Sequence, residues 1–460
     1  MTAGPADLVQ ELRKRGVTDV DDSTLTRALY SSDASLYRVV PQLVARPRHP
    51  DELLAILEVS RETGVPVTMR GAGTSIAGNA VGPGIVVDTV RHLNRVLSVD
   101  PEARTAVVQP GVVHADLQRA AAPHGLRFGP DPSTHTRCTI GGMIGNNACG
   151  SRALGYGRTS DNVVDLDVAW GPGAADVEAQ LGALTDQHLA HIRTEFGRFG
   201  RQVSGYSLEH LLPERGRSID RFLVGSEGTL ALVREATVRL VADEPHRLLL
   251  VLGYATMAEA ADAVPALLEA GGGRLVACEG LDARIVDLVR NRGSAVPELP
   301  RGQGWLFCEM AGAEVDEIRA ALGPLAHVSG SLEGRLVDDP VEAAALWRIR
   351  EDGAGLAARS LKTPAYSGWE DSAVPPDRLG AWLRDFDELL RGHGLDGVPY
   401  GHFGDGCVHV RIDFPFEPGN GGSAKCSATS SPRARSSCAT TRARCRASTA
   451  TAGPARSSCR

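Results

Sequence analysis

Two histidines in the C-terminal half of the sequence could bind a metal ion. His402 and His409 lie on either side of the turn Gly404-Asp405-Gly406, and residues 407–413 at the end of this turn are typical of a β-strand. Two imidazoles close to one tight turn can converge on a divalent ion, because neutral imidazole is a common metal ligand. Two histidines alone do not define such a site, so this interpretation requires a third ligand.

Arg350 and the acidic pair Glu370-Asp371 are further side chains in this half that could take part in binding or catalysis. The planar guanidinium of Arg350 suits bidentate binding of a carboxylate, although a surface ion pair with Glu351 on the same helix is an alternative. The acidic pair suits metal binding or acid–base chemistry, with capping of an expected helix at residues 376–390 as the alternative. The sequence leaves both choices open.

Two glycine-rich stretches, residues 70–79 and 130–150, predict a diphosphate ligand. Glycine allows positive φ angles and a close approach of the ligand to the backbone, and successive backbone N–H groups in such turns form concave anion sites. The first stretch stands between apolar strands at 65–69 and 85–90 and opens no helix, which excludes a Rossmann fingerprint. A P-loop is excluded because no Gly-Lys-Ser/Thr follows. We therefore expect loop amides to hold the phosphates, with glycines that serve only as tight turns as the alternative.

The two stretches, in this order, resemble the flavin-binding domain of the vanillyl-alcohol oxidase / p-cresol methylhydroxylase (PCMH) family. Three further segments extend the resemblance over residues 30–420, namely Gly225-Ser-Glu-Gly-Thr-Leu230, Trp347-Arg-Ile-Arg-Glu351 and Gly401-His-Phe-Gly-Asp-Gly-Cys-Val-His409. These segments are most similar to the branch that contains D-lactate dehydrogenases, D-2-hydroxyglutarate dehydrogenases and the flavin subunit of glycolate oxidase.

The resemblance implies a non-covalently bound FAD, because members that attach the flavin through the first loop carry His where Thr74 stands here. The residues implied to bind the pyrophosphate are Arg70, Gly71, Ala72, Gly73, Thr74, Ser75, Gly78 and Asn79. Those implied to line the ribityl and isoalloxazine portions are Pro130, Asp131, Thr134, Gly141, Gly142, Gly145, Asn146 and Gly150, with Gly157, Asp161 and Val164 nearby. Glu227, Gly228 and Leu230 are implied to close over the adenine side.

The resemblance also implies a catalytic centre that contains Arg350, His402 and His409. The two histidines resemble ligands of a divalent metal, zinc or a similar ion, which orients the substrate hydroxyl and polarises it as a Lewis acid. Arg350 resembles the arginine that clamps the substrate carboxylate. The implied third ligand and general base are the Glu and His of a Glu-His-Gly motif, which this sequence lacks. Cys407 stands where Asn usually follows Asp-Gly in the family.

Residues 421–460 have the composition of an out-of-frame translation. They contain no Leu, Ile, Val, Phe, Met, Asp or Glu, so they cannot form a hydrophobic core; a disordered basic tail is the alternative interpretation. Written in GC-rich codons and moved back by one base, Ala447–Ala455 becomes Gly-Glu-His-Gly-Asp-Gly-Arg-Ala-Arg, which includes the missing motif. We therefore predict a frameshift shortly after residues 419–422.

The composition predicts a soluble protein of two or three domains. The chain has 460 residues, of which 42% are hydrophobic. Residues 1–420 hold 41 basic and 56 acidic side chains, and this acidic balance argues against a nucleic-acid partner. No apolar run approaches the ~18 residues of a transmembrane segment, and residues 1–16 lack the apolar core of a signal peptide. We expect a cytoplasmic location, with peripheral membrane attachment as the alternative.

Hydrophobic periodicity and the resemblance together predict an α+β fold. Residues 1–242 are expected to form a two-subdomain FAD-binding domain of PCMH type. Residues 243–420 are expected to form an α+β substrate domain with an antiparallel sheet, truncated at its C-terminus, and residues 421–460 to be disordered. The main expected elements are helices at 51–64, 113–122, 257–270 and 317–322, a helical insert at 171–203, a hairpin at 96–99 and 105–108, and strands at 163–170, 236–240, 247–254, 275–279 and 305–310.

The function implied is an FAD-dependent dehydrogenase that oxidises a D-2-hydroxy acid, D-lactate or D-2-hydroxyglutarate, to the 2-oxo acid. The Cα hydride would pass to flavin N5 while a base takes the hydroxyl proton. The electrons would then pass to a quinone, a cytochrome, an electron-transfer flavoprotein or an iron–sulfur subunit, because this chain holds no iron–sulfur module. A metal-independent flavin oxidase or reductase, and a product that binds FAD but is inactive, are the alternatives. 2-Hydroxyglutarate would need a second cation, for which Arg348 and Lys362 are candidates.

Overall fold

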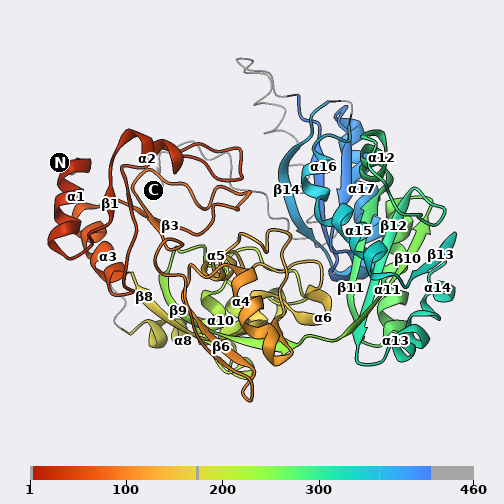
Figure 1. Ribbon diagram of the computed structural model, residues 1–460, viewed down its shortest axis with the longest axis horizontal. Helices are drawn as coiled ribbons and strands as arrows, with labels where there is room; N and C mark the ends of the chain where they lie inside the picture. The colour runs from red at the N-terminus through yellow and green to blue at the C-terminus, as the bar shows by residue number, and fades with distance from the viewer. Residues whose placement is uncertain (1–3, 172–175, 362, 416–460) are drawn as a thin grey trace. The chain divides into compact units, whose positions relative to one another are not determined.

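The computed structural model describes residues 4–171, 176–361 and 363–415 of the chain. Contacts divide these residues into two compact units (Figure 1), the first within Met1–Arg198 and Gly205–Asp243 and the second within Phe199–Ser204 and from Glu244 onward. The predicted out-of-frame tail lies outside the described residues, and so does Lys362. Among the described residues, no helix combines the length and the apolar composition that crossing a membrane requires.

The first unit begins with a small, mainly parallel sheet. Its strand order is β1 (Val20–Asp21), β2 (Leu43–Ala45), β4 (Ile85–Asp88) and β3 (Val67–Arg70), and only β1 runs antiparallel to its neighbour. Helices α1 (Pro5–Lys14) and α3 (Glu52–Thr63) bury leucine, isoleucine and valine side chains against these strands. Gly64 ends α3 in the left-handed conformation that glycine tolerates. The first glycine-rich stretch connects β3 to β4, as predicted.

A five-stranded antiparallel sheet forms the second core of this unit. The long strand β9 (Ala231–Ala242) pairs with β6 (Thr105–Val108), β7 (Leu126–Phe128) and β8 (Val163–Trp170), and β5 (Val96–Asp100) pairs with β6. The predicted hairpin is therefore present. The remaining helices of the first unit, apart from α5, are α2 (Thr24–Leu29), α4 (His114–Ala121), α6 (Ala153–Tyr156), α7 (Thr159–Asn162), α8 (Val177–Gln187), α9 (Leu189–Glu195) and α10 (Ile219–Leu223).

The sequence predicts a loop over the second glycine-rich stretch. This prediction is wrong for part of it, because the stretch contains helix α5 (Ile140–Asn146). The Thr139 hydroxyl caps this helix by accepting a hydrogen bond from the backbone N–H of Gly142 at 3.1 Å. A Cβ on Gly141 would lie only 2.7 Å from Pro110, so glycine permits the helix to pack closely there. Glycine is nonetheless a poor helix former, which concealed the helix in the sequence.

The second unit contains the predicted antiparallel sheet. Its order is β11 (Leu275–Asp282), β12 (Gly304–Gly312), β10 (His246–Tyr254) and β13 (Glu333–Val337), and every pairing is antiparallel. Strands β10, β11 and β12 are buried along most of their length on both faces of the sheet, whereas the edge strand β13 is largely exposed or half-buried. The helices of this part are α11 (Met257–Gly271), α12 (Ala283–Asn291), α13 (Val315–Leu322), α14 (Leu325–Val328), α15 (Pro340–Glu351) and α16 (Gly353–Ala357).

A smaller antiparallel sheet follows in the same unit. Strand β16 (Cys407–Ile412) lies between β14 (Tyr366–Ala373) and β15 (Gly397–Tyr400). The predicted helix at 376–390 is a short turn followed by α17 (Leu379–Gly392). A β-bridge between Gly280 and Gly401 joins strand β11 to the end of β15. This bridge brings the residue after Glu279 next to the residue before His402.

Candidate functional site

Three segments predicted to bind FAD lie against one another within the first unit. The side-chain amide of Asn79, in the first glycine-rich stretch, donates to Glu227 at 2.6 Å. The backbone N–H of Glu227 donates to the carbonyl of Gly145 at 3.0 Å, and that of Gly225 donates to Ile144 at 2.8 Å. The first loop, helix α5 and the Gly225–Leu230 segment therefore form one local structure.

Glycine is required at several places in the first loop. Gly73 and Gly78 have φ angles of 67° and 82°, which side chains other than glycine rarely adopt. A Cβ on Gly71 would lie 2.2 Å from the Thr139 hydroxyl oxygen, so the loop packs directly on the residue that caps α5. Such bare backbone beside a second glycine-rich segment fits the diphosphate of FAD.

Arg70 braces this loop through its side chain. Its guanidinium donates to the carbonyl oxygens of Ser32 and Ala80, each at 3.0 Å, and lies 5.1 Å from the centre of the Tyr30 ring. These contacts give Arg70 a structural role in holding the loop. Its contact with the pyrophosphate stays a prediction.

Most of the remaining predicted flavin residues lie in the segment between β7 and α7. Asp131 forms a β-bridge with Gly150 and an ion pair with Arg152 at 2.7 Å. Asp161 pairs with Arg158 at 3.0 Å. The Pro130 carbonyl lies 2.7 Å from the Nε2 atom of His114. Thr134 precedes α5, Gly142 and Asn146 lie on it, Gly157 ends α6, Val164 is half exposed on β8, and Gly228 and Leu230 precede β9.

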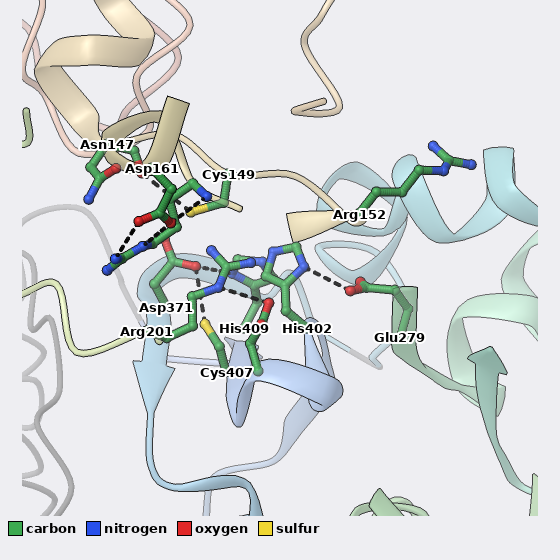
Figure 2. Close-up of polar contacts among 12 residues, drawn as sticks. Asn147, Cys149, Arg152, Asp161, Arg201, Glu279, Asp371, His402, Cys407 and His409 are labelled. Carbon is green, nitrogen blue, oxygen red and sulfur yellow. Dashed lines mark hydrogen bonds and ion pairs between the residues drawn. The ribbon is translucent and has the colours of Figure 1, made fainter. Parts of the chain in front are cut away.

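In the second unit, Asp371, His402 and His409 lie together (Figure 2). One possible ligand atom from each residue lies within 4.8 Å of those from the other two. The two imidazole rings are 5.2 Å apart between centroids, and Nδ1 of His409 is 3.8 Å from Asp371. Two nitrogen donors and one carboxylate are a donor set that suits zinc and similar ions. The chemistry of these residues therefore fits a divalent metal.

The turn and the sheet together position this cluster. His402 begins the turn Phe403–Asp405, Gly406 follows with a φ of 69°, and His409 lies on the next strand, β16. Strand β14 pairs with β16 through an irregular register between Trp369 and Ser372. Asp371 lies in this irregularity, with an unusual positive φ of 50°.

Asp371 is a site residue that the sequence did not assign. Capping of the helix at 376–390 is wrong for this residue, because Asp371 lies within strand β14 and the residue before α17 is Arg378; the side chain of Glu370 lies outside the described part of the chain. Cys407, the departure from the family's pattern, is buried and donates its S–H to Asp371 at 3.4 Å. No local pattern could have revealed the bulge that turns Asp371 toward the histidines.

Glu279 was also missed, and it contacts both His402 and Arg350. One carboxylate oxygen lies 3.1 Å from Nδ1 of His402, and the other forms an ion pair with the guanidinium of Arg350. Burial raises the pKa of Glu279 to about 7, against the opposing effect of the Arg350 charge. Burial also lowers the pKa of both His402 and His409, which favours neutral imidazoles that can act as ligands. An acidic residue directly after the apolar run Leu275–Cys278 of a predicted strand was the available signal, since buried charges need partners.

Arg350 itself is buried on the inner side of α15, with 4% of its surface exposed. The surface ion pair with Glu351 is therefore wrong. Its Nε atom is buried without a hydrogen-bond partner among the described residues. A buried, unsatisfied donor is costly, and an anionic group is the kind of partner that would satisfy it.

Arg201 is a further buried cation beside this cluster. Arg201 belongs to the Phe199–Ser204 segment of the second unit and pairs with Asp405 at 3.1 Å. Arg348 is exposed and Lys362 lies outside the described residues, so their role as a second cation stays a prediction. The sequence had placed residues 199–203 in an insert of the first domain, which concealed Arg201.

Both halves of the chain match known protein families. Residues 41–174 match the family described as "FAD binding domain", and residues 244–428 match "FAD linked oxidases, C-terminal domain". A D-lactate dehydrogenase of Archaeoglobus fulgidus is 30% identical over 406 residues, which cover 84% of this chain and 81% of the relative. The chain belongs to the FAD-linked oxidase family.

Other members of the FAD-linked oxidase family define the extent of this similarity. A D-2-hydroxyglutarate dehydrogenase of Escherichia coli (strain K12) is 29% identical over 452 residues, which cover 88% of this chain but 44% of the relative. The present FAD-linked oxidase thus spans less than half of that protein. A 4-ethylphenol oxidase from Gulosibacter chungangensis, 14% identical, has the same fold, with a TM-score of 0.65 over 95% of this chain and 88% of that one. The predicted flavin family and α+β fold are confirmed.

Proposed function

We propose that this FAD-linked oxidase oxidises a D-2-hydroxy acid to the 2-oxo acid. The observation that carries the proposal is the presence of a buried arginine donor and a His/His/Asp cluster in one unit. A 2-hydroxy acid carries a carboxylate next to a hydroxyl group. A guanidinium and a Lewis acid are the two groups best suited to bind them. The names of the relatives, D-lactate dehydrogenase and D-2-hydroxyglutarate dehydrogenase, support the same substrate class.

Each residue has a separate role in this proposal. Arg350 donates to the substrate carboxylate and fixes the orientation of the Cα–H bond. His402, His409 and Asp371 would hold a divalent ion, zinc or similar, which supplies Lewis acidity to the substrate hydroxyl when bound. The glycine-rich segments of the first unit would hold FAD non-covalently, which would supply the acceptor for the Cα hydride when bound; a separate carrier would take the electrons on. The three donors are at most partly exposed, which limits their hydration and strengthens their electrostatic effect.

The base that takes the hydroxyl proton is the histidine of the Glu-His-Gly motif in the restored reading frame. The same frame would add a glutamate to the three donors named above. This frameshift concerns residues outside the described part of the chain and stays a prediction. Resequencing the gene tests this prediction, and a gene sequence that encodes residues 421–460 in the same frame as the rest would refute the frameshift.

The experiment that tests the function is reduction of the bound flavin without oxygen. D-lactate and D-2-hydroxyglutarate are added separately to the purified protein, with the L-isomers as controls, and the visible flavin band is recorded. Bleaching by one D-acid that is lost after treatment with a chelator supports the proposal and names the acid. Bleaching that survives metal removal favours the metal-independent oxidase or reductase. A yellow protein that no acid bleaches favours the inactive FAD-binding product, and a frame-restored variant is then the one to measure.

A further inference from the structure

We infer that Glu279 is a positioning residue, which holds His402 in its metal-binding tautomer and fixes Arg350 at the same time. The inference rests on the function proposed above, because Glu279 would act there through His402 and Arg350. Glu279 thereby connects the two halves of the proposed site: the guanidinium that would bind the substrate carboxylate and the imidazole that would bind the metal ion.

The carboxylate of Glu279 is shared between two partners. One oxygen lies 3.1 Å from Nδ1 of His402 and the other pairs with a terminal nitrogen of Arg350, as Figure 2 shows for the histidine. Glu279 is 1% exposed and Arg350 4% exposed, so solvent does not compete for these contacts. Ion pairs that are buried in this way are far less screened than surface pairs.

The backbone fixes the position of Glu279 relative to His402. Gly280 and Gly401 exchange two backbone hydrogen bonds, at 2.8 and 3.2 Å. A Cβ on Gly280 would lie 2.5 Å from the ring of Phe403, so only glycine lets the strand approach the turn this closely. Because Glu279 precedes one glycine and His402 follows the other, the bridge places the two side chains beside each other.

The contact selects one tautomer of His402. The ion pair with Arg350 favours the ionised form of Glu279. An ionised carboxylate only accepts hydrogen bonds, so Nδ1 of the neutral ring carries the proton and Nε2 keeps its lone pair. A metal ion binds that lone pair. A carboxylate on the far nitrogen also raises the basicity of the ligand, and removal of such partners typically weakens metal binding about 10- to 100-fold.

A neutral amide at position 279 cannot satisfy both partners. If its oxygen faces Arg350, its N–H₂ group donates to Nδ1 of His402 and moves the ring proton to Nε2. If the oxygen faces His402, the N–H₂ group meets the donors of Arg350. Glu279→Gln keeps the size of the side chain and therefore isolates this effect.

The test compares Glu279→Gln with Asp282→Asn in the full chain. Asp282 is a matched control, since it is a buried acid on the same strand that pairs with Arg284 and with neither histidine. Zinc affinity is measured by chelator competition, and nitrogen–proton correlation spectra of the metal-free protein report the tautomer of His402. The signal dispersion of the same nitrogen–proton spectra verifies that the second unit of each variant is folded.

We expect the His402 proton on Nδ1 in the wild type, and zinc binding weakened about 10- to 100-fold in Glu279→Gln but not in Asp282→Asn. If the His402 proton of the wild type is on Nε2, this result alone overturns the inference. Equal zinc affinity in the wild type and Glu279→Gln also overturns it while the proposed metal site stands. A wild type that binds no zinc sinks the metal part of the proposed function, and the tautomer of the metal-free protein still decides the role of Glu279.

Discussion

Asp371 decides whether this chain can hold a metal ion through its described residues. It is the carboxylate that completes the two-histidine set, and a bulge with positive φ turns it inward. Asp371→Asn removes the charge of one of three donors, so we expect zinc affinity to fall at least about tenfold, since even indirect partners have effects of that size. Asp377→Asn, at a position with an exposed side chain, is the control in the same chelator competition. Equal affinities in both variants would show that Asp371 is no ligand.

Arg350 is expected to act through its planar fork, which lysine lacks. Arg350→Lys keeps a positive charge beside Glu279 but loses bidentate donation. We expect the affinity for oxalate, an unreactive mimic of a 2-hydroxy acid, to fall about 10- to 100-fold, the loss of roughly 1.5–3 kcal/mol for a charged hydrogen bond. Calorimetry measures this without turnover. Arg348→Lys on the same helix, at an exposed position, should bind oxalate like the wild type, and a normal Arg350→Lys protein would refute the clamp.

At the scale of elements, the contact between the first loop and α5 should control flavin binding. A Cβ on Gly71 would meet the Thr139 hydroxyl at 2.2 Å, so Gly71→Ala must push the loop away from the start of the helix. We expect this variant to lose most of its FAD, measured as the ratio of visible to ultraviolet absorbance. Gly355→Ala is the control because its Cβ would meet nothing within 4 Å. Full flavin content in Gly71→Ala would mean that the loop does not hold the cofactor.

The elements also show what could be predicted from the sequence. Strand β8 and the β5–β6 hairpin follow from local alternation of apolar residues, which needs no knowledge of the rest of the chain. Helix α5 could not be predicted, because its glycines oppose helix formation locally, and the close packing on Pro110 that requires glycine at position 141 is visible only in the fold. Asp371 and Glu279 depend on strand register and on the Gly280–Gly401 bridge, which are set by partners distant in sequence.

At the scale of the whole molecule, the two units each have their own hydrophobic cores. A ligand stabilises the part that binds it, by about 2.7 kcal/mol at a hundredfold excess over its Kd. We expect FAD and zinc to shift different transitions in scanning calorimetry, FAD that of the first unit and zinc that of the second. A single transition raised by either ligand would show instead that the chain unfolds as one cooperative body.

The position of Phe199–Ser204 affects how this protein can be divided into fragments. The segments on both sides of them belong to the first unit, whereas they belong to the second. No single cleavage of the polypeptide therefore yields the two units intact. A fragment that starts at Glu244 lacks Arg201, the ion-pair partner of Asp405. In that fragment Asp405, which lies between His402 and His409 in the sequence, loses this ion pair. Truncation or domain exchange at the boundary between Asp243 and Glu244 would therefore yield a second unit that lacks Phe199–Ser204.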